Sequence, residues 1–114
     1  MSDYDIETIE LSIEHSKKLI ARKQSLQKLI KNRDFKAIIT EGYFEQEAQR
    51  LVLMKAEPSM QGEDAQKEIL RQIDAIGSLR QYFMMINALG NNAEKALEDD
   101  EQTLEEVMAE GINS

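Results

Sequence analysis

The 114-residue chain has no cysteine, no tryptophan and a single proline. Without cysteine it can form neither disulfide bonds nor thiolate metal sites. Only two valines are present, and no sustained alternation of apolar and polar residues occurs, so the sequence offers little for a β-sheet. It also lacks the run of about 18 apolar residues that a membrane-spanning helix requires. These absences favour an all-α protein with no membrane span.

Helix-favouring residues make up most of the chain, and their apolar members recur at helical spacing. The pattern predicts three helices, at about 3–31, 34–55 and 63–89. Asn32 marks the first break between them, and the loop around Pro58 marks the second.

The glycines within these segments leave some alternatives open. Gly42 either ends a short helix at Glu41 or lets one continuous helix pack closely. Gly77 lies on the apolar face of the third helix, where a missing side chain would let another helix approach. Gly90 predicts the end of that helix, and the stretch 91–94 (Asn-Asn-Ala-Glu) resembles a capping box that would begin a fourth.

Charge is sorted into blocks along the chain. Residues 3–14 carry five acids and no base, residues 17–36 carry eight bases and one acid, and residues 94–110 carry eight acids and one base. Such blocks suit contact with other charged surfaces or with each other. Four consecutive acids at 98–101 repel one another, so we expect the C-terminal segment to be helical only where it docks.

These patterns together predict an all-α fold, an antiparallel helical bundle of three to four helices with an acidic C-terminal helix or tail. The expected domain division is a helical bundle domain at residues 1–93 and the acidic helix or tail at residues 94–114. A core of this size gives only ordinary stability, which oligomerisation would increase.

No residue pattern indicates catalysis, a cofactor or a metal. His15 is the single histidine, and the sequence fixes no nucleophile or carboxylate beside it. The acidic run 99–101 lacks the glycine and the alternating spacing of a calcium loop. The five glycines are isolated, so no phosphate-binding loop is present. We therefore expect no enzymatic activity, no cofactor and no metal site.

One apolar cluster is a candidate partner-binding site. It covers more than one side of the third helix and consists of Tyr82, Phe83, Met84 and Met85. A helix that is apolar on several sides is either deeply buried or faces a partner. In a chain this short, self-association is the natural outcome, and a homo-oligomer is expected.

A second cluster joins positive charge to an aromatic ring. Its members, which could bind an anion such as a nucleotide, are Arg33, Lys36, Tyr43 and Arg50. The alternative, which we favour, is that Tyr43 lies half-exposed at the edge of the core while the bases are solvated.

Nucleic acid is disfavoured as a partner. The basic side chains of residues 17–36 spread around most of their helix, no aromatic residue is interleaved to stack on a base, and the whole protein is acidic. The acidic segment has two further readings: a nucleic-acid mimic, or a source of solubility, which we favour.

Five short stretches resemble small uncharacterised helical proteins of tailed bacteriophages. They are residues 29–36, 42–44, 47–52, 73–77 and 82–83. The resemblance covers roughly half the chain and consists of core and helix-boundary residues, so it carries no functional residues.

What the resemblance implies is a phage-encoded accessory protein, located in the cytoplasm of the bacterial host or in the virion. The expected function is non-enzymatic: a self-associating virion structural or assembly factor that docks onto a larger phage or host protein. The alternative is a host-defence antagonist that sequesters an anionic nucleotide signal or mimics nucleic acid with its acidic tail.

Overall fold

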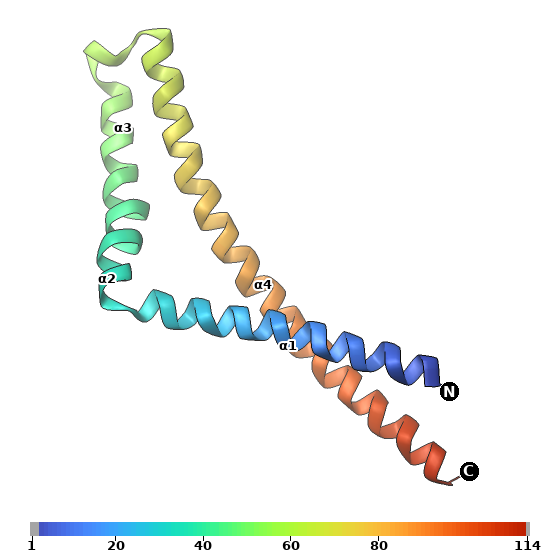
Figure 1. The fold of residues 1–114 in the computed structure, drawn as a ribbon. Coiled ribbons are helices and arrows are strands. Elements are labelled where there is room, and N and C mark those ends of the chain that lie inside the picture. Colours follow the sequence, from blue (N-terminus) through green and yellow to red (C-terminus); the bar gives the residue numbers. More distant parts are fainter. Residues whose placement is uncertain (1–2, 114) are drawn as a thin grey trace. The chain divides into compact units, whose positions relative to one another are not determined.

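The computed structural model describes residues 3–113, and the side chains of residues 5–111. Every regular element in this range is helical (Figure 1), which confirms the all-α prediction. The elements are α1 (Asp3–Lys31), α2 (Arg33–Phe35), the π-helix η1 (Lys36–Glu47), α3 (Ala48–Ala56), the 3₁₀-helix η2 (Pro58–Met60) and α4 (Glu63–Asn113).

The chain divides into two compact units. Unit 1 comprises residues 1–26 and 85–114, so it contains most of α1 and the C-terminal part of α4. Unit 2 comprises residues 27–84, which hold the end of α1, the helical run from α2 to α3, η2 and the first part of α4. The predicted domain division at residues 93 and 94 stays a prediction.

In unit 2, a capped helix begins directly after α1. The side-chain oxygen of Asn32 accepts hydrogen bonds from the backbone N–H groups of Asp34 and Phe35, at 3.0 Å each, which satisfies two donors that a helix start leaves free. Helical structure then runs without a gap to Ala56. The alternative in which a helix ends at Glu41 is therefore wrong, and the continuous helix through Gly42 is confirmed.

The middle of this run is a π-helix because of how its apolar residues are spaced. Phe35, Ile39, Phe44 and Ala48 are half-buried and lie four, five and four residues apart. An α-helix, with 3.6 residues per turn, would carry them out of phase. The i→i+5 hydrogen bonds of a π-helix take in more residues per turn, so Phe44 and Ala48 both reach the core of this unit.

The run packs antiparallel to the first part of α4 around a small apolar core. Leu51 is fully buried and clusters with Ile69 and Ile76, and Phe44 and Met54 are among the partly buried side chains packed against them. The turn between the helices is closed by glutamine side chains. Gln66 donates to the carbonyl oxygens of Lys55 and Met60, at 3.0 and 2.8 Å. Gln61 donates to the same Lys55 carbonyl at 2.9 Å and to that of Glu57 at 2.8 Å.

In unit 1, α1 and α4 run antiparallel. The Ser12 hydroxyl donates to Asp100 at 2.6 Å, and the Lys23 ammonium donates to Glu94 at 2.8 Å. The residue number rises along α1 as it falls along α4, which fixes the relative direction. Among the side chains of this unit that the structure describes, those of Ser16, Leu26, Ile86 and Ala93 are buried.

The predicted end of a helix at Gly90, and the capping box that follows it, are wrong. α4 continues through both to Asn113. Gly90 is buried, and a Cβ atom built on it would lie 2.5 Å from the Cβ of Lys23. The glycine therefore serves close approach of α1 to α4 and not chain reversal.

The acidic segment is helical to Asn113, and Leu97, Leu104 and Val107 are half-buried on it. The predicted bundle of three to four helices is borne out only as far as its all-helical content. Within residues 3–113, no helix combines the length and apolar character needed to cross a lipid bilayer.

Candidate functional site

Unit 2 contains an open groove between the run η1–α3 and α4. Its volume is about 490 Å³. One wall comes from η1 and α3, with Thr40, Phe44, Glu45, Ala48 and Val52. The other comes from α4, with Ile73, Ile76, Gly77 and Arg80.

The groove exists because one helix lacks a side chain where the other presents a small one. Gly77 carries no Cβ, and a Cβ built there would meet nothing within 4 Å. Ala48 lines the opposite wall, and Val52 beyond it is 62 % exposed. Phe44 and Ile76 belong to the core cluster. An apolar interior is thus left open between the helices.

Two charged side chains line the groove without a partner. Glu45 and Arg80 make no ion pair or hydrogen bond through their side chains within the part of the chain whose side chains are described. A guanidinium and a carboxylate that are free in this way can bind opposite charges on a partner surface.

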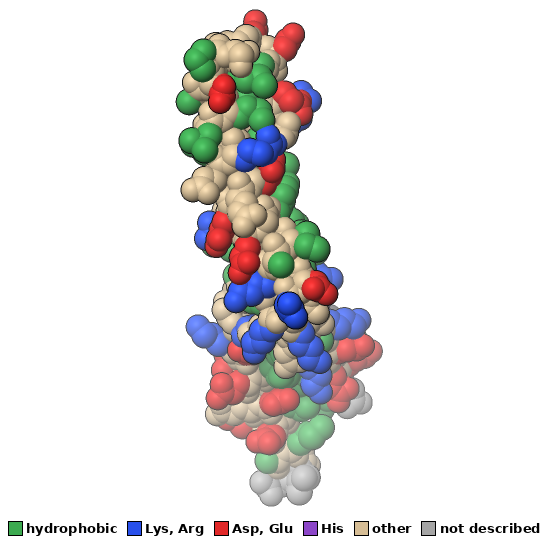
Figure 2. All heavy atoms as spheres, turned by 90° about the vertical axis from the view of Figure 1, so that its left-hand side faces the viewer, with side chains coloured by type: hydrophobic (Ala, Val, Ile, Leu, Met, Phe, Trp, Pro, Cys, Tyr) green, Lys and Arg blue, Asp and Glu red, His purple; other side chains and the backbone are tan. Residues whose placement is uncertain are grey.

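The units differ sharply in charge. Residues 27–84 hold nine acidic and nine basic side chains, whereas residues 1–26 and 85–114 hold thirteen acidic and five basic ones. Unit 2 is therefore neutral, and the net charge of −8 belongs to unit 1. Large apolar side chains are exposed on unit 2, as Figure 2 shows toward the η2 end. They include Ile38, Val52, Leu53, Leu70, Tyr82 and Met84.

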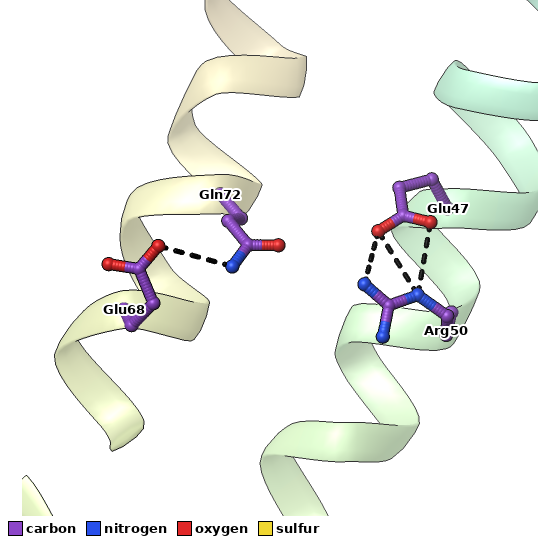
Figure 3. Close-up of polar contacts among 4 residues, drawn as sticks. All are labelled: Glu47, Arg50, Glu68 and Gln72. Atoms are coloured by element: carbon purple, nitrogen blue, oxygen red, sulfur yellow. Dashed lines mark hydrogen bonds and ion pairs between the residues drawn. The ribbon is translucent and has the colours of Figure 1, made fainter. Parts of the chain in front are cut away.

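Local polar pairs cover another part of unit 2 (Figure 3). The Arg50 Nε donates to both carboxylate oxygens of Glu47, at 3.1 and 3.0 Å, and the guanidinium also donates through a terminal nitrogen. This bonding holds the pKa of Glu47 below its usual value and raises the pKa of Arg50. On α4, Gln72 donates to Glu68 at 3.2 Å.

The predicted partner-binding residues are divided by the structure. Tyr82, Met84 and Met85 are exposed, as a contact surface requires. Phe83 is half-buried, and its ring centroid lies 6.0 Å from that of Phe35 and 5.9 Å from that of Phe44. Phe83 therefore packs inside unit 2, and binding of a partner by this cluster stays a prediction.

The predicted anion-binding residues do not line one cavity. Arg33 and Lys36 are exposed near the start of the run. Tyr43 packs beside Phe44 with the ring centroids 6.0 Å apart, and it borders a cavity different from the one that Arg50 borders. Arg50 is engaged by Glu47. Binding of a nucleotide by these residues stays a prediction.

Sequence reasoning named Gly77 as a point of approach but missed the groove around it. The missing signal is the phase of the π-helix, which turns Phe44 and Ala48 toward α4. His15 is exposed, and no group of three potential metal ligands occurs among the described residues.

Comparisons with protein-family models, with curated proteins and with solved structures gave no match to this chain.

Proposed function

We propose that this protein is a non-enzymatic interaction module that self-associates through unit 2. The observation that carries the proposal is the open apolar groove in a unit whose formal charge is zero. Full burial of a side chain such as valine or leucine contributes about 1.5–3 kcal/mol. A few such side chains closed over by a partner therefore contribute several kcal/mol, which offsets part of the free energy that association costs.

A second copy suits this surface for an electrostatic reason. Two copies of unit 1 repel each other, since each contributes a charge of −8. Two copies of unit 2 meet with no net repulsion. Association through unit 2 also leaves the charged unit in solvent, which limits further aggregation.

The resemblance to small proteins of tailed bacteriophages supports a role in virion structure or assembly. In that role the protein self-associates and docks onto a larger phage or host protein, in the host cytoplasm or in the virion. The acidic part of α4, Glu94 to Glu110, then provides a charged surface that sets register on a basic partner.

Light scattering over a range of protein concentrations tests self-association. We expect a monomer at low micromolar concentration and a defined oligomer as the concentration rises. Val52→Glu places a charge on the groove wall and should prevent the oligomer. Ile38→Glu is the matched control, because Ile38 is 67 % exposed but borders a different cavity. A monomer at every concentration up to the high micromolar range would refute the proposal.

A further inference from the structure

The two walls of the groove in unit 2 carry matching rows of residues. The row on η1–α3 has members at steps of three and four residues, and it consists of Glu45, Ala48 and Val52. The row on α4 has the same steps, counted toward the N-terminus, and it consists of Arg80, Gly77 and Ile73. Because the two walls are antiparallel, both rows advance in the same direction along the groove. Each row is therefore charged at one end, small in its middle and apolar at its other end.

Contacts in the core place the two rows level with each other. Leu51 clusters with Ile76, and the ring centroid of Phe44 lies 5.9 Å from that of Phe83. Seven residues separate Phe44 from Leu51, and seven separate Ile76 from Phe83, as an antiparallel pair of helices requires. The three pairs of residues that the rows form across the groove are therefore level to within about one helical turn.

The charged ends of the two rows have no partner within the described chain. Glu45 and Arg80 are exposed, and their side chains form no ion pair or hydrogen bond with any residue whose side chain is described. Glu47 and Arg50, which do not line this groove, bind each other instead. A surface that covers the groove can therefore gain by presenting a base over Glu45 and an acid over Arg80.

We propose that two copies of unit 2 stack with their grooves face to face, about a two-fold axis that runs along the groove, and form a four-helix bundle. This inference rests on the self-association proposed above and specifies its geometry. A two-fold axis parallel to the helices keeps every residue at its own level and exchanges the two walls. The run η1–α3 of one copy therefore lies over α4 of the partner subunit, and these two helices are antiparallel.

This stacking sets each charge against its opposite. Glu45 meets Arg80 of the partner subunit, and Arg80 meets Glu45 of the partner subunit. The four charges alternate in sign around the axis, so each charge has opposite charges beside it and its like charge diagonally across. A two-fold axis that crosses the groove would instead place α4 over α4 and the run over the run, so neither charge would face the wall that carries the other.

The order of the charges commits the groove to a second copy. A partner must present an acid and a base at one level on two antiparallel helices, and unit 2 itself carries this arrangement. A single helix lying in the groove would have to carry both charges on its two flanks and would leave its own outer side uncovered. Two hairpins with one apolar face each bury both faces at once, which is the arrangement of an antiparallel four-helix bundle.

The remaining residues of the two rows allow the grooves to close. Ala48 of one copy lies over Gly77 of the partner subunit, so the helix axes can approach to the lower end of their usual separation of about 8–10 Å. Val52, which is 62 % exposed in the described chain, lies over Ile73 of the partner subunit. Covering it removes apolar surface from water, which favours association.

Charge reversal in separate chains tests the pairing between copies. Glu45→Arg alone and Arg80→Glu alone each set like charges against each other, so each variant should dimerise about tenfold more weakly than the unaltered protein in light scattering. An equimolar mixture of the two variants should recover most of the affinity, because both contacts between the two different chains then join opposite charges. Glu41→Arg is the matched control, since Glu41 is exposed on η1 but does not line the groove, and it should dimerise like the unaltered protein.

Cysteine cross-linking tests the position of the axis, because the chain contains no native cysteine. Ala48→Cys mixed with Gly77→Cys should give a covalent dimer of the two variants with a short thiol-specific reagent. Leu53→Cys mixed with Gly77→Cys is the control and should cross-link several-fold less, since Leu53 is exposed on α3 but does not line the groove. Preferential cross-linking of Gly77→Cys with itself would place α4 over α4 and would overturn the inference.

The outcomes separate this inference from the proposed function. A dimer that does not recover in the mixture of Glu45→Arg with Arg80→Glu, although both variants keep the circular dichroism of the unaltered protein, overturns the stacking and leaves self-association standing. Recovery only when both substitutions are in one chain would place the ion pair within a single copy and would also overturn the stacking. An unaltered protein that is monomeric at every concentration, with no cross-link in any mixture, overturns both.

Discussion

Two glycines of α4 show how the two units differ. In unit 1, a Cβ at Gly90 would lie 2.5 Å from the Cβ of Lys23, so α1 already fills the space that the missing side chain leaves. In unit 2, a Cβ at Gly77 would meet nothing within 4 Å. The same residue type closes one helix contact and leaves the other open.

The polar groups follow the same division. The Lys23 stem lies over Gly90, and its ammonium binds Glu94 at 2.8 Å. Unit 1 therefore completes its helix contact with its own charges. In unit 2, Asp74 and Arg80 flank Gly77 without partners among the described residues. The charges at the closed glycine are thus paired within the chain, whereas those at the open glycine are not paired within its described part.

The largest effect on stability is expected in the buried core of unit 2. Leu51 is fully buried in the core that holds the groove walls together. Leu51→Ala should lower the free energy of unfolding by about 2–5 kcal/mol, since it removes buried methyl groups and leaves a cavity. Thermal or urea unfolding followed by circular dichroism measures this.

Leu53→Ala, on the same helix at a position that is 67 % exposed, is the control for Leu51→Ala. It should change the unfolding free energy by no more than about 0.5 kcal/mol. Equal losses in the two variants would show that the packing of α3 against α4 is not as described.

The second largest effect on stability is expected at Gly90, where α1 packs closely against α4. Gly90→Ala places a methyl group against Lys23, whose Cβ is fixed to the α1 backbone and cannot swing away. We expect unit 1 to lose about 1–3 kcal/mol of stability, as overpacked contacts do. Chemical denaturation checks the change, and Gly111→Ala is the control because a Cβ there meets nothing within 4 Å. A more stable Gly90→Ala protein would contradict the close approach of the helices.

Substitution of Gly77 should change the unfolding free energy in the opposite direction. Gly77→Ala adds no clash, and alanine is the better helix former, so the variant should gain about 0.5–1 kcal/mol when measured at a concentration where the protein is monomeric. Dimerisation, followed by light scattering, should weaken at the same time. A loss of monomer stability would show that the space beside Gly77 is already filled.

Much of the helical structure could be predicted from local sequence patterns. Apolar spacing located α1, and Asn32 and Pro58 located the breaks on either side of the second helical run, because caps and proline act through neighbouring residues. The end predicted at Gly90 failed because a glycine after a helical stretch is typical both of a helix end and of a helix crossing. Only the position of Lys23 in space distinguishes the two.

The groove could not be predicted from the sequence for a similar reason. The spacing of Phe35, Ile39, Phe44 and Ala48 is irregular for an α-helix, and the stretch from Lys36 to Glu47 is a π-helix instead. Gly77 was visible as a gap on an apolar face. Whether α3, α1 or nothing filled that gap depended on packing between distant segments, which single-sequence periodicity does not contain.

The smallest effect concerns the junction where η1 becomes α3. Glu47 ends η1, and Arg50, which lies in α3, donates hydrogen bonds to it. These bonds lower the pKa of Glu47, so the folded state binds a proton at this site less readily than the unfolded chain. The stabilisation is present above the usual pKa of glutamate, about 4.3, and is lost as the pH falls through the lowered value.

Glu47→Gln tests this contribution at the pH extremes. The variant should melt slightly below the unaltered protein at pH 7. The difference should vanish near pH 2, because the protonated Glu47 of the unaltered protein and the glutamine of the variant are then both uncharged. The shift is small because the pair is exposed and screened by water and salt.

Glu41→Gln is the control. It removes an exposed carboxylate that makes no ion pair with any described residue, so the melting temperature of this variant should follow that of the unaltered protein at both pH values. A difference between Glu47→Gln and the unaltered protein that persists undiminished at pH 2 would assign the effect to packing at the junction, not to the ion pair.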